Sequence, residues 1–342
     1  MSPVTMQDVA ARAGVSAKTV SNVLRGAPGA SEATRARVHD AVRELGYRFN
    51  AGASALRSGR RRAVALAVPS LTAPEHAALA QSLMTGARGR QIVLELTRGE
   101  AAAEERLLAG SWRASCDGLI LVPTGLDPDG IDPEGVPGAV VLVAESGPAG
   151  LARATSPVDA QAALVAAHLQ ETGHRRVAVL GSRSPADRWT RAQVDALRAT
   201  GLEVGDDTIA LIDVSEPFRS AIEAMTRLVR SGVVLDAVVC HDDVVAAGAA
   251  SALARHGRRT GPGLAVIGRG DTETARFATS ALTSVDTGAA ALAEAALVLL
   301  DSLTQDRDAK PRTVEVAPNL RVRASSAPAD ASGAHQTAST HE

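Results

Sequence analysis

The sequence has few of the residues that build disulfide frameworks or metal sites. Its 342 residues include 2 cysteines and 8 histidines. Cys116 and Cys240 each lie beside an apolar run, without CxxC spacing or a histidine cluster, so we expect buried free thiols. The histidines are scattered and join no nucleophile and carboxylate in a catalytic pattern. We therefore expect no enzyme activity and no cofactor.

Uninterrupted apolar runs and aromatic side chains are also scarce. Asp8, Arg12 and Lys18 interrupt the N-terminal segment, so we expect neither a signal peptide nor a membrane span, and we expect a cytoplasmic protein. Aromatic residues make up 2% of the chain. Few rings are therefore available to stack on a sugar or another flat ligand.

Charge is distributed unevenly along the chain. Residues 1–62 hold eleven Lys or Arg and four Asp or Glu, a net charge of +7, so the remainder carries −9 to reach the overall −2. A basic N-terminal segment is typical of contact with nucleic acid. A chain of this length also predicts two or three domains.

Residues 5–24 have the pattern of two short helices joined by a tight turn. Thr5 and Asp8 form a capping-box pattern, Gly14 can end the first helix, and Ser16 can cap the second. This arrangement predicts a helix-turn-helix. A short, polar and basic outer face suits entry into a major groove. The outer face of the second helix is expected to carry Ala17, Lys18, Ser21, Asn22 and Arg25.

A third helix and a linker follow. Ser31 can open this helix and Gly46 can close it, which completes a three-helix domain over residues 1–49. Residues 50–58 are small apart from Leu56, and composition alone predicts a flexible linker there.

From residue 63 apolar runs alternate with alanine-rich amphipathic segments, which is typical of a parallel sheet covered on both faces. Two doubly wound halves are expected, with the division near residue 157. Residues 327–342 are rich in Ala, Ser, Thr and Pro and are expected to be disordered. The expected strands are 63–69, 91–97, 117–123, 139–145, 176–182, 208–214, 237–242 and 264–270, and the expected helices include 75–88, 159–172, 189–200, 218–231, 244–256 and 288–303.

Three segments together resemble one protein family. DVAARAGVSAKTVSNVL at 8–24, TRARVHDAVRELGY at 34–47 and FNAGASALRSG at 49–59 are similar to the N-terminus of the lactose-repressor (LacI) family of bacterial transcription regulators. Weaker similarity, such as ETGHRRVAVLG and HDDVVAAGAASAL, continues to about residue 326.

The resemblance implies a fold and a function. After the helix-turn-helix domain and a hinge at 50–62, residues 63–326 would form a two-lobed α/β core similar to type I periplasmic binding proteins. Lobe one would comprise about 63–157 and 285–311, and lobe two about 158–284 and 312–326. The chain would be a DNA-binding transcriptional regulator, a repressor, that binds a pseudo-palindromic operator as a homodimer and responds to a small-molecule effector. The alternative is an effector-blind repressor whose core only dimerises.

Two sets of site residues follow from this resemblance. In the family a hinge leucine, here Leu56, wedges into the minor groove and kinks the duplex. We expect base contacts from Ala17, Lys18 and Asn22. The complete expected set for DNA is Thr5, Ser16, Ala17, Lys18, Thr19, Ser21, Asn22, Thr34, Asn50, Ala53 and Leu56.

The effector cleft departs from the family pattern. Trp189 stands where an arginine commonly holds the effector, unless a register shift places Arg188 or Arg191 there, and the family's GFDD becomes residues 268–271, Gly-Arg-Gly-Asp. We therefore expect a smaller or less polar effector than a typical sugar, or none. The expected effector residues are Thr72, Trp189, Arg191, Phe218, Asp243 and Asp271.

Overall fold

The computed structural model describes residues 4–24, 29–47, 61–87, 89–183, 187–213, 215–306 and 308–327. These residues form two compact units, 1–62 and 63–342, and each unit is described by itself. Most of the expected hinge, with Asn50, Ala53 and Leu56, lies outside the described residues, as do Arg25 and the tail beyond 327.

The first unit is the predicted three-helix domain. It consists of α1 (Met6–Ala13), α2 (Ala17–Leu24) and α3 (Glu32–Leu45). Gly14 takes a φ of 65°, which a residue with a side chain rarely adopts, and so ends α1 tightly before α2 begins. Val9, Val20 and Val38, one from each helix, are fully buried and form the centre of the core.

Lobe one of the second unit is a six-stranded sheet with the order β11-β5-β4-β3-β1-β2. Alternate residues of β1 are buried on opposite faces: Leu66 packs towards α5 and α12, whereas Ala65 packs towards α6. The strands are β1 (Ala63–Val68), β2 (Gln91–Leu96), β3 (Gly118–Leu121), β4 (Val140–Val143), β5 (Ala152–Thr155) and β11 (Thr313–Glu315). The helices are α5 (Pro74–Gly86), α6 (Ala101–Leu108) and α12 (Ala289–Gln305), with 3-10 turns at Ser111–Ala114, Pro128–Gly130 and Pro133–Gly135.

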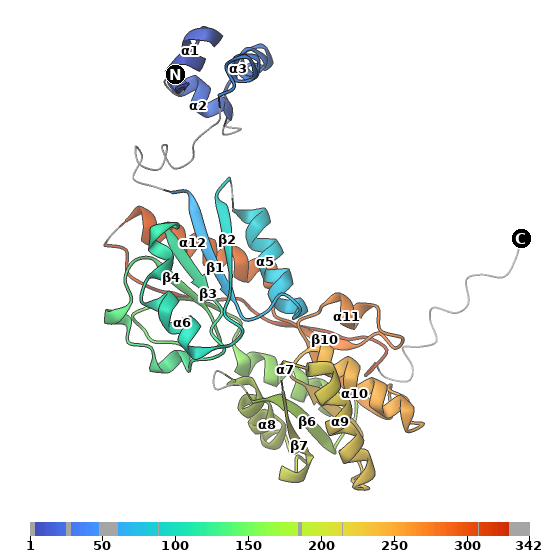
Figure 1. The fold of residues 1–342 in the computed structure, drawn as a ribbon. Helices are drawn as coiled ribbons and strands as arrows, with labels where there is room; N and C mark the ends of the chain where they lie inside the picture. The colour runs from blue at the N-terminus through green and yellow to red at the C-terminus, as the bar shows by residue number, and fades with distance from the viewer. Residues whose placement is uncertain are drawn as a thin grey trace, which may run out of the picture. The chain divides into compact units, whose positions relative to one another are not determined.

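Lobe two repeats this architecture with the strand order β12-β10-β9-β8-β6-β7. All pairs in both sheets are parallel except β10 with β12. The strands are β6 (Val177–Ser182), β7 (Ile209–Ile212), β8 (Ala237–Cys240), β9 (Ala265–Arg269), β10 (Thr283–Asp286) and β12 (Asn319–Arg321). The helices are α7 (Val158–Glu171), α8 (Trp189–Ala199), α9 (Pro217–Arg230), α10 (Asp243–Arg255) and α11 (Glu273–Arg276), with a 3-10 turn at Asp206–Thr208. Figure 1 shows the two lobes of this unit.

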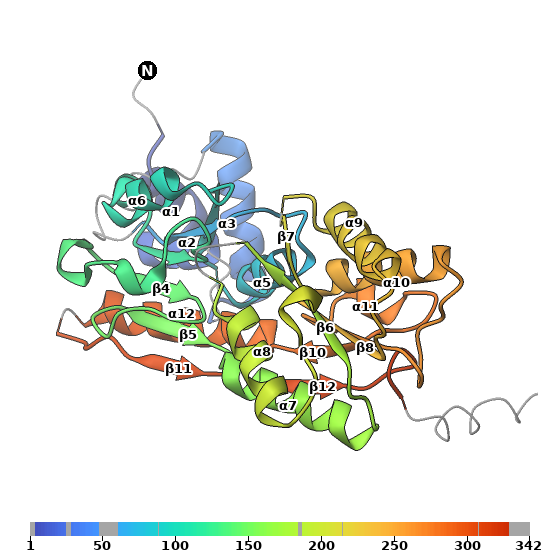
Figure 2. The same cartoon turned by 90° about the horizontal axis from the view of Figure 1, so that it is seen from below.

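The chain passes between the lobes three times, between β5 and α7, between β10 and α12, and between β11 and β12. The prediction that lobe one resumes near residue 285 is wrong, because β10 extends the lobe-two sheet beside β9. The assignment of residues 312–315 to lobe two is also wrong, because β11 pairs with β5 (Figure 2). The boundaries therefore lie near 287 and 317 instead of 284 and 311.

Other sequence expectations can be compared directly with the fold. The eight expected strands and six expected helices are present, with ends that differ by a few residues. The elements without a counterpart among them are α6, α11, β5, β10, β11 and β12. Cys116 and Cys240 are buried and free, as expected. Among the described residues no helix combines the length and apolarity needed to cross a membrane.

Candidate functional site

In the first unit, hydrogen bonds at the helix starts hold α1 and α2 in place. The Thr5 amide donates to Asp8 Oδ2 at 2.8 Å, and the Asp8 amide donates to Thr5 Oγ1 at 3.4 Å, which completes the predicted capping box. Hydrogen bonds to the Asp8 carboxylate from the Thr5 amide and the Thr5 hydroxyl lower the pKa of Asp8. The Thr19 amide donates to Ser16 Oγ at 3.1 Å. Ser16 therefore caps α2, and the exposed face of this helix is held in a defined orientation.

The structure places most of the expected DNA-contacting residues on the surface of this unit. Thr5, Ser16 and Lys18 are exposed, and Ala17, Thr19, Asn22 and Thr34 are partly exposed. The prediction that Ser21 lies on the outer face is wrong, because only 9% of it is exposed. Ser21 follows the fully buried Val20, and its small side chain fits against the core.

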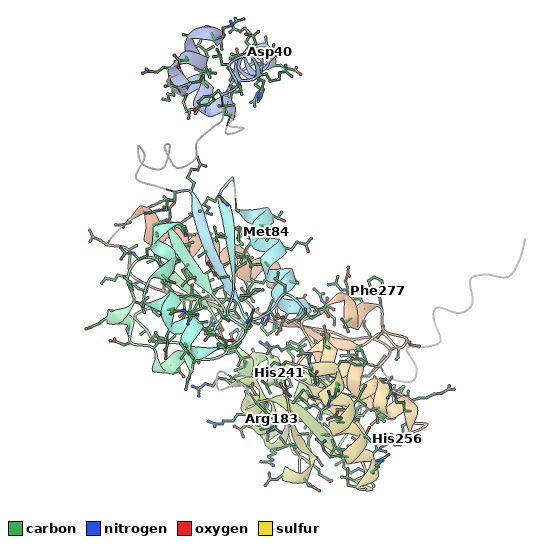
Figure 3. The ribbon with its side chains drawn as sticks, viewed as in Figure 1. Asp40, Met84, Arg183, His241, His256 and Phe277 are labelled. Carbon is green, nitrogen blue, oxygen red and sulfur yellow. The ribbon has the colours of Figure 1, made fainter. Side chains whose placement is uncertain are left out.

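In the second unit a cavity of about 460 Å³ lies between the lobes. Its lining comes from segments that follow the carboxyl ends of β1, β3 and β4 in lobe one and of β6, β8 and β9 in lobe two. Ligands of open parallel sheets bind at this edge. Figure 3 labels His241, a lining residue that follows β8, close to where the two lobes meet.

An ion-pair cluster crosses the cavity. Arg269, at the end of β9, places Nη1 3.0 Å from Glu145 Oε1 and Nη2 3.5 Å from Glu75 Oε2. Only 12% of the Arg269 side chain is exposed. Glu75 and Glu145 belong to lobe one and Arg269 to lobe two, so a half-buried ion pair links the lobes.

Further polar contacts link the same two edges. Glu145 Oε2 accepts hydrogen bonds from the amides of Arg188 at 2.9 Å and Trp189 at 3.1 Å, where α8 begins. A carboxylate is stabilised at this end of a helix by the free amides and the helix dipole. Arg188 Nη2 also lies 2.6 Å from Asp129 Oδ2 and 2.9 Å from Asp127 Oδ1, so a second set of ion pairs joins the lobes.

The three residues after β8 all line the cavity but make different contacts. Asp242 caps α10 by accepting from the Val245 amide at 2.8 Å. Asp243 accepts from the Thr272 amide and hydroxyl at 2.7 and 2.8 Å, and from the Ser284 hydroxyl at 2.6 Å. These contacts anchor the start of α10 to the segment after β9.

Burial and neighbouring charges shift the pKa values of these groups. Burial raises the pKa of Asp243 to about 6, against the hydrogen bonds from Ser284 and Thr272. Burial opposes ionisation of Asp242 and His241 as well, but their mutual hydrogen bond and charge attraction outweigh it, so the pKa of Asp242 is lowered and that of His241 is raised. Burial lowers the pKa of His76.

The sequence-predicted effector residues are only partly brought together. Thr72 and Asp243 line the cavity. Trp189 is 1% exposed and packs edge-on against His241, with ring centroids 5.6 Å apart, so His241 rather than the expected indole faces the cavity. The remaining three, Arg191, Phe218 and Asp271, are absent from the lining formed by the described residues.

Several residues expected at the effector site make contacts within the protein instead. Asp271 is buried and pairs with Arg276 at 2.8 Å and with Arg323. Asp242, rather than Asp243, caps α10. Gly270 has a φ of 115°, where a side chain would be strained, which explains the missing carboxylate at this position.

Sequence reasoning missed Glu75, Glu145, Asp187, Asp242 and Arg269 as a group. Their positions in the sequence could have indicated these residues, because Glu145, Asp242 and Arg269 each stand at or just after the end of an apolar strand. Charged residues at the carboxyl ends of parallel strands meet at one edge of a sheet. The Gly-Arg-Gly-Asp segment, which departs from the family pattern, contains Arg269 of this group.

Two family models and several relatives match this chain. The model "Bacterial regulatory proteins, lacI family" matches residues 5–50, and "Periplasmic binding protein-like domain" matches residues 166–326. The HTH-type transcriptional regulator GalR of Escherichia coli (strain K12) is 32% identical over 317 residues, which cover 87% of this chain and 90% of GalR.

Solved structures give the same result. The transcriptional regulator CelR in complex with cellobiose is similar at 29% identity and a TM-score of 0.66, covering 94% of this chain and 99% of that one. The lac repressor dimer bound to operator and the anti-inducer ONPF has the same fold, with a TM-score of 0.78 at 23% identity, covering 95% of this chain and 99% of that one. The chain therefore belongs to the LacI family of bacterial regulatory proteins and is a DNA-binding transcriptional regulator.

Proposed function

We propose that the chain represses transcription by binding a pseudo-palindromic operator as a homodimer, with α2 in the major groove. The observation that carries this proposal is the capped α2, which exposes Lys18 and partly exposes Ala17 and Asn22 while Val20 and Val23 anchor its other face. One short helix reads few base pairs, so a second copy is needed for selectivity. The lac repressor structure, a dimer on operator DNA, supports this arrangement.

Selection of bound sites from random DNA tests the proposal. We expect two half-sites related by two-fold symmetry, about one helical turn apart centre to centre or with a fixed spacing. A selected site without internal symmetry would contradict the dimeric mode, and no enrichment of any sequence would contradict specific binding.

The hinge makes a separate contribution in this proposal. Leu56 would enter the minor groove at the operator centre, where an apolar wedge unstacks a base step and bends the duplex. Leu56→Ala is expected to reduce both the bend and the specific affinity, as measured by gel phasing and titration of the operator. An unchanged bend angle would mean that residues 50–58 act only as a linker.

Dimerisation is proposed to use the α5 and α12 face of lobe one. Met84 on α5 and Val298 on α12 are 53% and 47% exposed, and a groove between these helices is lined by residues of both. Figure 3 shows Met84 on the outer side of α5. Exposed apolar side chains gathered on one face are typical of a protein interface.

The interlobe cavity is proposed as the effector site. Its place at the strand ends and its mixed polar lining support this role, as does the cellobiose complex of CelR. The alternative, an effector-blind repressor, is favoured by the Arg269 ion pair and the Arg188 contacts, which already join the lobes through the chain's own side chains.

A thermal-shift screen of sugars, nucleosides and amines distinguishes these two forms of the proposal. A ligand that binds only the folded chain raises the melting temperature by mass action. We expect a ligand that does so to change operator affinity as well. Stabilisation without any effect on operator binding would favour the effector-blind form.

A further inference from the structure

The surroundings of Arg269 carry an excess of negative charge. The four carboxylates Glu75, Glu145, Asp187 and Asp242 interact electrostatically with this single guanidinium, which leaves a net charge of −3. Protonation of His241 would lower the excess by one unit without removing it. Arg98 also lines the cavity but its side chain is exposed. Half-buried carboxylates in excess of cations favour a ligand that brings positive charge.

Glu75 is the carboxylate with the fewest partners in this group. Its oxygens lie 3.5 Å from Arg269 Nη2 and 3.8 Å from His76 Nε2, and no hydrogen bond to its carboxylate is formed by the described residues. Each of the other three accepts at least one hydrogen bond shorter than these distances. Glu75 therefore keeps the capacity to accept hydrogen bonds from a ligand.

A second, smaller cavity adjoins the first at the same cluster. It measures about 120 Å³ and shares Glu75, Glu145 and Arg269 with the larger one. The residues Thr155, Ser156 and Gln161 also line it and are 4%, 7% and 2% exposed.

Thr155 Oγ1, Ser156 Oγ and Gln161 Oε1 are buried without a hydrogen-bond partner among the described residues. Buried polar atoms are costly unless hydrogen-bonded. The smaller cavity is therefore built to receive hydroxyl groups or other atoms that both donate and accept.

We propose that the interlobe cavity binds a small polyhydroxylated cation, of the amino polyol or amino sugar class, whose ammonium group is held at Glu75 and whose hydroxyls reach Thr155, Ser156 and Gln161. This inference rests on the proposed role of the cavity as the effector site. It replaces the expectation, drawn from the sequence, of a less polar effector.

Three probes built on a six-carbon polyol chain, which differ mainly in charge, test the proposal: meglumine, sorbitol and gluconate, which are cationic, neutral and anionic. Binding to the full chain is measured by calorimetry and by the shift in melting temperature. We expect meglumine to bind about tenfold more tightly than sorbitol, as for one added hydrogen bond to a charged group, and gluconate to show no saturable binding. Sorbitol or gluconate binding as tightly as meglumine, or no meglumine binding, would overturn the proposal.

A matched pair of variants locates the charge preference. Glu75→Gln should abolish the preference for meglumine over sorbitol, whereas Glu134→Gln, which changes an exposed glutamate outside the cavity lining, should retain it. A preference that survives Glu75→Gln in a variant with unchanged melting temperature would place the cation elsewhere and reject the assignment.

Operator binding is measured on the same preparations without any probe. If the wild-type chain binds no operator, the proposed DNA-binding mode is rejected, and the charge preference of the cavity stands as a separate result. Normal operator binding with no charge preference would reject only this inference.

Discussion

Asn22 is the α2 residue with the side chain best suited to base discrimination, because its amide both donates and accepts. It is partly exposed in the described unit. We expect Asn22→Ala to lose about 1 to 3 kcal/mol of discrimination between operator and random DNA, with little change in salt dependence. Competitive titration at several salt concentrations measures both quantities.

Lys18→Ala is the matched control on the same helix. It removes a positive charge, so the slope of log affinity against log salt should fall by about one unit if Lys18 contacts phosphate. Equal weakening of Asn22→Ala on every sequence would mean that Asn22 does not read bases.

The raised pKa of Asp243 predicts that the stability of the folded chain depends on pH. Its pKa of about 6 in the folded chain is raised above its ordinary value of 3.8, so the folded state binds the proton more tightly. Its contribution to the free energy of unfolding is therefore fully present below pH 3.8 and is lost as pH rises through about 6. The change is at most about 3 kcal/mol, at 1.36 kcal/mol per pKa unit.

Denaturant unfolding of the wild type and of Asp243→Asn, at a series of pH values, measures this change. Asparagine does not titrate, so the difference between the two chains removes the contribution of all other groups. We expect the wild type to lose stability relative to the variant between pH 4 and 6. A constant difference across this range would show that Asp243 is not perturbed.

At the residue scale, the sequence predicted the helix caps that are formed between residues close together in the chain. The capping box of Thr5 and Asp8 and the cap by Ser16 were correct because the partners lie three residues apart. The pair of Arg269 and Glu145 was not predictable in this way, because the two residues are 124 positions apart and meet only when both sheets have formed.

At the scale of elements, α6 fixes a loop that lines the cavity. The fully buried Glu104 accepts hydrogen bonds from the amides of Thr124, Gly125 and Leu126 at 2.9 to 3.1 Å. Glu104→Gln replaces one acceptor oxygen by a donor that faces amide groups. We expect a loss of about 1 to 3 kcal/mol in the free energy of unfolding.

Urea denaturation measures that loss, and Glu105→Gln is the control. Glu105 is the next residue on α6 and is exposed, so its substitution should change stability little. Equal stability of the two variants would mean that the Glu104 carboxylate does not hold the loop.

Long apolar segments were predicted well and short ones were not. β1 is six residues long and fully buried, so its apolar run predicts a strand in any register. β11 and β12 have three residues each, with mixed burial, and their sequences do not indicate which sheet they join. The assignment of β11 to the wrong lobe follows from this lack of local signal.

At the scale of the whole molecule, we expect formation of the proposed dimer to depend on the exposed apolar side chains of the α5 and α12 face. Met84→Glu places a charge on the α5 and α12 face and should shift the chain towards monomer and weaken operator binding, because the two half-sites would no longer be bound together. Sedimentation or light scattering measures the oligomeric state. Val234→Glu, at another exposed apolar residue in lobe two, should leave the dimer intact.

Because the chain passes between the lobes three times, the order in which it is synthesised affects how the protein folds. Leu66 and Ile120 of the lobe-one sheet pack against Leu292 and Leu300 of α12, which leave the ribosome only after nearly all of lobe two. Until then α5 covers this apolar face of the first sheet only in part, so lobe one cannot finish folding as an independent nascent domain. The part of this face that α12 covers in the native state therefore stays exposed until synthesis is almost complete, and apolar surface exposed in this way favours aggregation.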